Sequence, residues 1–400
     1  MRKLLPLLFL AALLAACTKN NDPAKDSSSG QMTLQLDNAK ELTFRIYGEN
    51  LVVDWGDQQV EKFSKIEQQE VHHSYAAAAT YRIKISGDGM DYFQVFEPNI
   101  SSIDVAANTA LKTLQCYGTK IDSLDLSANR NLQELLCYDN QLTFLDVSKN
   151  SALDGLSCSS NKLTSLNVSN NTKLTMLLCG DNKLTSLDLS NNTLLDYLEC
   201  GFNPLGALNI SKNTKLTLLS CRKNQLASLD LSNNKDLVSL DCSSNQLTQL
   251  NLAANNIGNL NCDSNQIKEL DLSKQTALDI LSCSVNLLAK LDLSQNVNVR
   301  HVGCLHNNIQ ALDVSKNIKL ESIATNENPI SALDVSANTL LNSVIVHNNN
   351  FSATGLNNLF KTLHANPPPP GGVKYMLYLG NPGTATCDPG IYTSKGWSTL

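Results

Sequence analysis

Cysteine is the residue type in this chain whose spacing could most readily support chemistry. The chain has 12 cysteines, and ten of them recur at a step of 21 residues, apart from one step of 20 between Cys242 and Cys262. Thiols at a fixed step could form disulfides, hold a metal ion or fill a dry core as small apolar groups. The ten positions are Cys116, Cys137, Cys158, Cys179, Cys200, Cys221, Cys242, Cys262, Cys283 and Cys304.

These three roles for the cysteines make different demands on geometry. Neighbouring turns of a repeat place equivalent residues within bridging range, but parallel side chains that point the same way do not suit the torsion of a disulfide. A metal site needs clustered ligands such as C-x2-C pairs, whereas each repeat here offers one cysteine. The spacing therefore favours free, buried thiols that act as apolar filler, and we expect no metal and no other cofactor.

The cysteines belong to a longer repeated motif. Residues 132–150 read L-x-x-L-x-C-x-x-N-x-L-x-x-L-D-V-S-x-N, and a fixed period of this size is typical of a solenoid. The motif resembles the leucine-rich repeat, L-x-x-L-x-L-x-x-N-x-L, with Cys at the third apolar position. Residues 89–350 hold about 13 such rungs. We therefore expect a mostly β leucine-rich-repeat solenoid with a 21-residue period.

The column of cysteines resembles the cysteine ladder of bacterial internalin-type repeat proteins, and the resemblance covers residues 111–310. An asparagine follows nine of the ten cysteines by three residues, where the chain turns inward, and Thr119 follows Cys116. An amide has both donors and an acceptor, so stacked asparagines can satisfy backbone groups at the turn. We therefore expect Asn140, Asn161 and Asn182 to be structural, and Thr119 to break their column.

Alternation along each rung predicts which side chains face the core. Leu135 and Cys137 should point inward, and Glu134, Leu136 and Tyr138 should lie on the concave face. Aromatic side chains gather in the N-terminal half of this face, where they could anchor a ligand; the alternative is a scattered surface without anchors. The candidate ligand-binding residues are Tyr117, Glu134, Tyr138, Tyr197, Glu199, Phe202, Arg222 and Lys223.

The first residues predict export. Residues 1–17 combine a basic start, an apolar run and a small-residue exit, which is typical of a secretory signal. Residues 14–17, LAAC, resemble the bacterial lipobox, which implies that Cys17 is acylated and becomes the mature N-terminus. Residues 18–30 then form a flexible tether. The resemblance implies a lipid-anchored protein of the cell envelope, attached to the outer membrane and exposed at the surface.

Residues 31–88 predict a small β-sandwich. Their apolar and β-branched residues alternate in short runs bounded by Gly, Asn or Asp. The sequence VDWGD at residues 53–57 and HSY at residues 73–75 resemble the polycystic-kidney-disease (PKD) type of immunoglobulin-like module.

This β domain also contains residues that could bind calcium. Asp54, Asp57 and Asp88 are candidate ligands, but capping of its own turn through backbone hydrogen bonds explains Asp57 better. His72 and His73 lack a metal-binding motif, so we expect them in a surface loop.

The repeat period fails after residue 350. Apolar residues in 354–364 have helical spacing, and residues 374–379 alternate as a strand does. We expect residues 351–400 to form a helical and strand cap that closes the open end of the core.

Charge and motifs exclude several function classes. The formal charge is −6, and removal of Arg2 and Lys3 with the signal would leave 29 basic and 37 acidic residues, which disfavours nucleic-acid binding. Catalytic motifs such as G-x-S-x-G, H-E-x-x-H or a P-loop do not occur, so we assign no catalytic residue.

The function that the sequence favours is that of a monomeric, non-enzymatic envelope protein. Its concave face would bind a protein or glycan partner, and its N-terminal lipid would bind the membrane. A structural envelope component without a soluble ligand remains an alternative, and so does a glycan-active enzyme. The enzyme is disfavoured because Glu134 and Glu199 are three rungs apart, whereas paired catalytic carboxylates lie about 5 to 10 Å apart.

Overall fold

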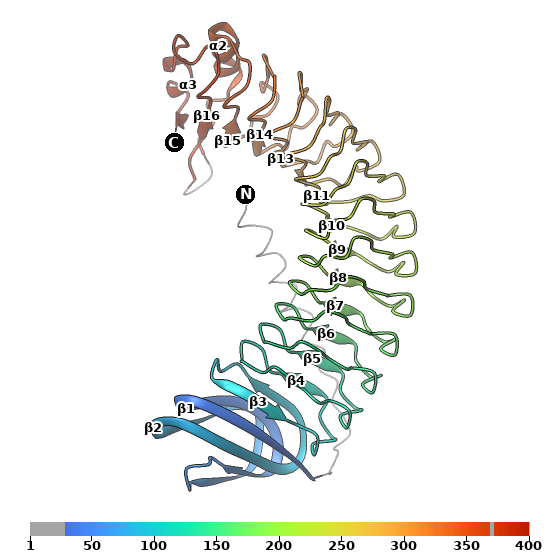
Figure 1. The fold of residues 1–400 in the computed structure, drawn as a ribbon. Helices are drawn as coiled ribbons and strands as arrows, with labels where there is room; N and C mark the ends of the chain where they lie inside the picture. Colours follow the sequence, from blue (N-terminus) through green and yellow to red (C-terminus); the bar gives the residue numbers. More distant parts are fainter. Residues whose placement is uncertain (1–28, 369–371, 400) are drawn as a thin grey trace.

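The computed structural model describes residues 29–368 and 372–399, which form one long arc (Figure 1). The predicted signal segment, Cys17 and nearly all of the tether lie outside the described residues. Among the described residues, no helix has the length and apolar character needed to cross a bilayer.

A parallel sheet of short strands lines the inner side of the arc (Figure 1). The middle residue of each strand points into the core, and each strand pairs in register with its neighbours. Leu135 therefore lies between Leu114 and Leu156. The repeat strands are β4 (Thr113–Gln115), β5 (Glu134–Leu136), β6 (Gly155–Ser157), β7 (Met176–Leu178), β8 (Tyr197–Glu199), β9 (Leu218–Ser220), β10 (Ser239–Asp241), β11 (Asn259–Asn261), β12 (Ile280–Ser282), β13 (His301–Gly303), β14 (Ser322–Ala324) and β15 (Ser343–Ile345).

Each rung buries the same set of apolar side chains. Leu135 and Cys137 enter the core from the strand side, while Leu142, Leu145 and Val147 enter from the opposite wall, and none of the five is more than 3% exposed. The opposite wall is extended or turned, and residues 105–350 contain no helix. The prediction of a mostly β leucine-rich-repeat solenoid is therefore confirmed.

An antiparallel β domain precedes the solenoid. It consists of β1 (Ser29–Asp54), β2 (Val60–Val95) and β3 (Ile100–Asp104). The long strands β1 and β2 bend and pair along two lengths, with Leu34 beside Ile83 and Leu42 beside His73. Their buried sides meet at Phe44, whose ring centroid lies 5.6 Å from that of Trp55 and 5.6 Å from that of Phe93.

The β domain and the solenoid share a strand. Strand β2 runs through the domain boundary predicted at residue 88, and its residues Tyr92, Phe93 and Gln94 pair in parallel with β4. Phe93 therefore packs in both cores, since it contacts Phe44 on one side and lies beside Leu114 on the other. The first rung of the solenoid is thus built from the β domain.

The ten repeat cysteines form one buried column. All are 0% exposed, and none is bonded to another cysteine. Burial raises the pKa of these thiols, to about 12 for Cys116 and for Cys304. The thiols therefore stay protonated at neutral pH and pack as small apolar groups.

The asparagine column beside the cysteines joins successive rungs. The side-chain Nδ2 of Asn161 donates to the carbonyl of its own Cys158 (3.0 Å) and to that of Cys137 in the preceding rung (3.0 Å). Its Oδ1 accepts from the backbone N–H of Leu142 (2.9 Å). Thr119 does not interrupt this column as expected but begins it, because its hydroxyl donates to Oδ1 of Asn140 (2.5 Å).

A second buried amide column lies on the opposite wall. Nδ2 of Asn150 donates to the carbonyls of Leu126 (3.0 Å) and Asn129 (2.8 Å) in the preceding rung, and Asn150 is 0% exposed. The sequence motif contains this asparagine, but its spacing did not distinguish a buried amide from a surface turn. Asn129, Asn171, Asn192, Asn213, Asn234, Asn296, Asn317 and Asn338 make equivalent bonds.

This second column explains the one short repeat. In the repeat of Cys242, Asn234 and Leu237 are separated by two residues, whereas Asn255 and Ile257 are separated by one. The shorter turn leaves the N–H of Ile257 in need of an acceptor. In the next rung, Gln275 stands where the column has asparagine, and its Oε1 accepts from that N–H (2.8 Å). The longer side chain therefore compensates for the missing residue.

The C-terminal residues cap the solenoid and extend its sheet. Helix α2 (Ala353–Thr362) covers the last core, as predicted, and is followed by β16 (Tyr375–Leu377), α3 (Gly390–Thr393) and β17 (Ser398–Thr399). Strands β16 and β17 continue the parallel pairing of β15, so the sheet has two strands beyond the predicted rungs.

Buried polar groups hold this cap together. The Nζ of Lys374, a residue that is 3% exposed, donates to the carbonyls of Asn366 (2.6 Å) and Lys395 (2.7 Å). Trp397 is also buried, and its Nε1 donates to the carbonyl of His364 (2.9 Å).

Replacement of Gln275 by asparagine should destabilise the solenoid. The shorter side chain cannot reach the N–H of Ile257, and an orphaned buried donor costs about 1–3 kcal/mol. We expect a lower urea midpoint for Gln275→Asn, measured by circular dichroism. The same change at exposed Gln295 is the matched control and should be neutral.

A second variant adds one residue between Asn256 and Ile257 to Gln275→Asn. It restores the 21-residue step, so it should recover the stability of Gln275→Asn. A Gln275→Asn variant as stable as the parent would show that the Ile257 bond does not compensate for the deletion.

Candidate functional site

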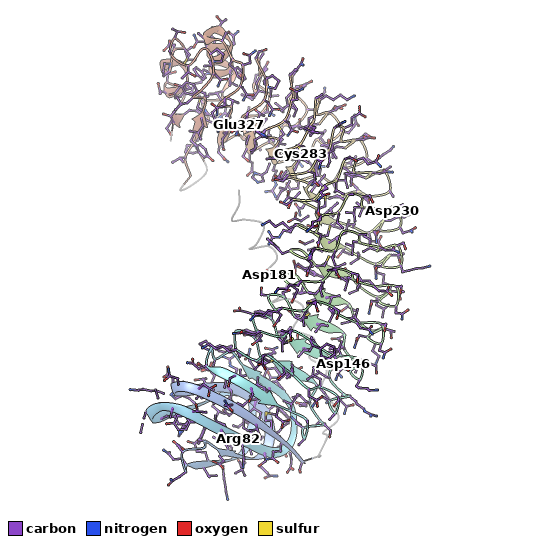
Figure 2. All side chains as sticks on the ribbon, in the orientation of Figure 1. Arg82, Asp146, Asp181, Asp230, Cys283 and Glu327 are labelled. Carbon is purple, nitrogen blue, oxygen red and sulfur yellow. The ribbon has the colours of Figure 1, made fainter. Side chains whose placement is uncertain are left out.

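The concave face combines four outward positions of each rung. Two belong to the strands, the third follows the cysteine directly, and the fourth follows it by two residues and is held with positive φ. In Figure 2, Asp181 and Glu327 project from the inner side of the arc, while Asp146 and Asp230 project from the outer side. The positive-φ residues, with φ between 52 and 58, are Asp139, Ser160, Asp181, Phe202, Lys223, Ser244, Ser264, Val285, His306, Glu327 and Asn348.

Three aromatic rings stack at the N-terminal end of this face, and we name Phe96, Tyr117 and Tyr138 the aromatic ledge. The ring centroids of Phe96 and Tyr117 lie 6.0 Å apart, and those of Tyr117 and Tyr138 lie 4.5 Å apart with an interplanar angle of 6°. Burial, together with Tyr117, raises the pKa of Tyr138 to about 12. The ledge therefore presents ring edges and the hydroxyls of its two tyrosines.

A chain of polar side chains runs beside the aromatic ledge. Nε2 of Gln94 donates to Oε1 of Gln115 (2.8 Å) and to the hydroxyl of Tyr117 (3.2 Å). Nε2 of Gln115 in turn donates to Oε2 of Glu134 (3.2 Å). Gln94 is 8% exposed, and its own Oε1 is buried without a partner among the described residues. Sequence reasoning missed Gln94 and Gln115, although alternation along the strands places both on this face.

Glu199 lies in the sheet surface rather than projecting from it. Its carboxylate accepts from the backbone N–H groups of Gly180 (3.1 Å) and Gly201 (3.1 Å) and from the hydroxyl of Ser159 (3.3 Å). A Cβ atom at Gly180 would collide with this carboxylate. Burial raises the Glu199 pKa, and the three hydrogen bonds oppose that shift. The geometry makes Glu199 a brace across three rungs.

Two cations share one aromatic ring at the middle of the face. The guanidinium carbon of Arg222 lies 4.5 Å from the ring centroid of Phe202, and Nζ of Lys223 lies 4.8 Å from it. We name Phe202, Arg222 and Lys223 the cation clamp. Arg222 and Phe202 are half-buried, and Lys223 is exposed.

The eight candidate residues therefore do not form a single cluster. Tyr117, Glu134 and Tyr138 lie together at the aromatic ledge, while Phe202, Arg222 and Lys223 form the clamp several rungs away. Tyr197 belongs to the same rung as Phe202, and burial and the Glu199 charge raise its pKa.

His301 and His306, in the later rungs, each contact a different side chain. His301 Nδ1 lies 2.9 Å from the Ser322 hydroxyl, and His306 Nδ1 lies 2.8 Å from a carboxylate oxygen of Glu327. In the described part of the chain, no group of three or more His, Cys, Asp or Glu could hold a metal ion.

One expectation for the β domain is wrong. His73 does not lie in a surface loop but in β2, where it is 5% exposed, stacks on Trp55 at 4.5 Å and has Nε2 2.9 Å from Oδ2 of Asp57. Strand alternation buries it between Val71 and Tyr75. Asp57 caps its turn as expected, because its Oδ1 accepts from the N–H of Gln59 (3.1 Å).

Loss of the Glu199 brace should destabilise the middle rungs. Glu199→Ala leaves the N–H groups of Gly180 and Gly201 without their acceptor, which costs about 1–3 kcal/mol for each group that water does not reach. We expect a lower thermal midpoint by calorimetry, whereas Glu269→Ala, at an exposed site, should leave it unchanged. Equal midpoints for the two variants would rule out the bracing role.

Comparison with known proteins gives no match among protein-family models or curated protein sequences. Among solved structures, the functional domain of InlJ from Listeria monocytogenes, which includes a cysteine ladder, is 31% identical, with 69% of this chain and 72% of that chain covered and a TM-score of 0.60. An internalin, InlF from Listeria monocytogenes, is 22% identical over 77% of this chain and 86% of that chain, with a TM-score of 0.59.

A more distant structure is that of the Arabidopsis receptor kinase HAESA in complex with the peptide hormone IDA and the co-receptor SERK1. It is 20% identical, with 73% of this chain and 54% of that chain covered and a TM-score of 0.60. InlF and HAESA show the fold alone, whereas InlJ matches more than two thirds of both chains and shares the cysteine ladder. The chain therefore belongs to the internalin-type leucine-rich-repeat proteins that carry a cysteine ladder.

Proposed function

We propose that this chain is an exported, lipid-anchored binding protein of a bacterial cell envelope, and that its concave face holds a protein partner. The observation that carries the proposal is the aromatic ledge. Phe96 is 44% exposed, although the repeat itself needs no aromatic residue at this position. Aromatic side chains that a fold does not need are frequent anchors in protein interfaces.

The stacking of the ledge favours a protein over a glycan. Sugar rings pack on the open faces of aromatic rings, but the Tyr117 ring is stacked between those of Phe96 (6.0 Å) and Tyr138 (4.5 Å). Ring edges, hydroxyls and the neighbouring Gln94 and Gln115 amides remain, and these groups suit the side chains and backbone of a polypeptide. HAESA, which shares the fold, was solved with a peptide hormone bound.

Removal of the ledge tyrosines should weaken capture of the partner. Tyr117→Ala with Tyr138→Ala should weaken binding by at least about 30-fold, because interface hot spots contribute about 2 kcal/mol or more each. The measurement is cross-linking and pull-down from envelope extracts, followed by titration of the captured protein. Phe144→Ala removes an aromatic ring that is 65% exposed outside the strand column, so it is the matched control.

Three outcomes would contradict this proposal. The double variant could bind as tightly as the parent, the control could lose binding equally, or a glycan array could give specific binding where no protein is captured. The last outcome would move the assignment to glycan recognition.

Lipid attachment at Cys17 has its own test. Cells that express the chain and are fed an alkyne-tagged fatty acid should label the parent and not Cys17→Ser, because the thiol carries the acyl chain. Cys387→Ser, which removes the other cysteine outside the repeat column, is the control. Equal labelling of the parent and Cys17→Ser would exclude the anchor.

A further inference from the structure

We propose that the partner binds the concave face through two separated anchors: an apolar side chain on the aromatic ledge, and a single carboxylate, from an aspartate or glutamate, on the cation clamp. The proposal rests on the proposed protein-binding function and deepens it, since it specifies the chemistry of the bound segment.

The clamp presents two cations that the fold does not neutralise. Among the described residues, neither Arg222 nor Lys223 forms an ion pair or a side-chain hydrogen bond, and both are held on the uncharged ring of Phe202. The acidic group Glu199 attracts Arg222 without a direct ion pair, and its oxygens already accept from Gly180 and Gly201. Two uncompensated cations at the centre of a binding face therefore call for an anion from the partner.

The ring also fixes the cations in advance. A guanidinium stacked on an aromatic face keeps its N–H donors free at its edge, where they can bind both oxygens of a carboxylate. Phe202 and Lys223 both have φ 56, and this left-handed conformation directs them from the turn onto the face. Because little side-chain freedom remains to be lost, binding of an anion costs less entropy.

The direct path between the anchors is lined by small residues, so a backbone can lie along it. From Tyr138 to Arg222, the position after the cysteine is Ser159, Gly180 and Gly201, while the larger Met176 and Tyr197 stand at the first position of their strands, beside this path. Tyr138 follows β5 and Arg222 follows β9, so four strand steps separate the anchors. At about 4.8 Å per step this separation is about 19 Å, which an extended peptide spans with about six residues.

The rungs beyond the clamp disfavour a second acidic residue in the bound segment of the partner. Asp241 and Asp263 lie there, and both are largely buried. The Oδ1 of Asp241 accepts from the Ser243 hydroxyl (2.6 Å), and the Ser282 hydroxyl donates to Asp263 (2.8 Å). No basic side chain pairs with either carboxylate among the described residues, so a second acid in the partner would be repelled.

A peptide array can test the spacing directly. The probes are ten-residue peptides with Phe at position 2 and glycine and serine elsewhere, except for one Glu placed at each position from 4 to 10. Matched sets carry Gln or Lys in place of Glu. The purified parent chain should bind best when Glu follows Phe by about six residues, and about tenfold more weakly or worse when Gln replaces Glu.

Two variants separate the anchors. Arg222→Gln with Lys223→Gln should lose the preference for Glu over Gln, but it should keep the preference for Phe over Gly at position 2. Lys149→Gln with Lys316→Gln removes the same charge from exposed turns away from the strands, so it should behave as the parent.

The outcomes distinguish this inference from the proposed function. If the parent captures a partner in extracts but its array signal does not depend on Glu, or if the clamp variant keeps the preference for Glu, the inference is wrong and the protein-binding function stands. If neither peptides nor extracts yield a partner, both fail. If a heparin hexasaccharide displaces the best peptide and binds more tightly, the anion belongs to a glycan and the carboxylate assignment is overturned.

Discussion

Hydrogen bonds from buried side-chain amides to the backbone of the preceding rung are the interaction on which the rest of the structure depends. A rung of this solenoid is too short to satisfy its own turns, and a buried carbonyl without a donor is costly. Asn161 meets this need for two rungs at once, because its amide reaches the carbonyls of both Cys158 and Cys137. The second column does the same on the opposite wall, so each rung is fixed at two points of its circumference.

This constraint explains why the repeat length varies so little. A change of one residue in a rung moves every amide beyond it away from its carbonyl. The chain contains one such change, and the cost is met locally by Gln275, whose side chain is one methylene longer than that of asparagine. Thr119 shows the same requirement at the end of a column, where a hydroxyl is enough because only one acceptor, Oδ1 of Asn140, remains to be satisfied.

Features that depend on a single rung could be predicted from the sequence, whereas features that depend on several rungs could not. The period and alternation placed Leu135 and Cys137 inside and Tyr138 on the concave face. The bracing position of Glu199 depends on the absence of side chains at Gly180 and Gly201, which belong to different turns. The sequence placed Tyr117 and Tyr138 at equal positions of the concave face, but the stacking of their rings and the sharing of Phe202 by two cations are contacts between neighbouring rungs. His73 was misplaced because its burial comes from pairing with a distant part of β1.

A repeat scaffold also offers a way to separate folding from function within one sequence. Every rung needs its leucines, its cysteine or substitute and its amides, so departures at outward positions are not required by the fold. The position after the cysteine is serine or glycine in five rungs, yet it is tyrosine at 117 and 138 and arginine at 222. The left-handed position is Asp, Ser or Asn in six of the eleven rungs that have a non-glycine residue there, and it is Phe202, Lys223, Val285, His306 or Glu327 in the other five. A left-handed conformation costs such side chains roughly 1–2 kcal/mol. Among the described residues, the side-chain contacts that Phe202 and Lys223 gain in return are within the clamp itself, and this is why we propose that the clamp binds a partner.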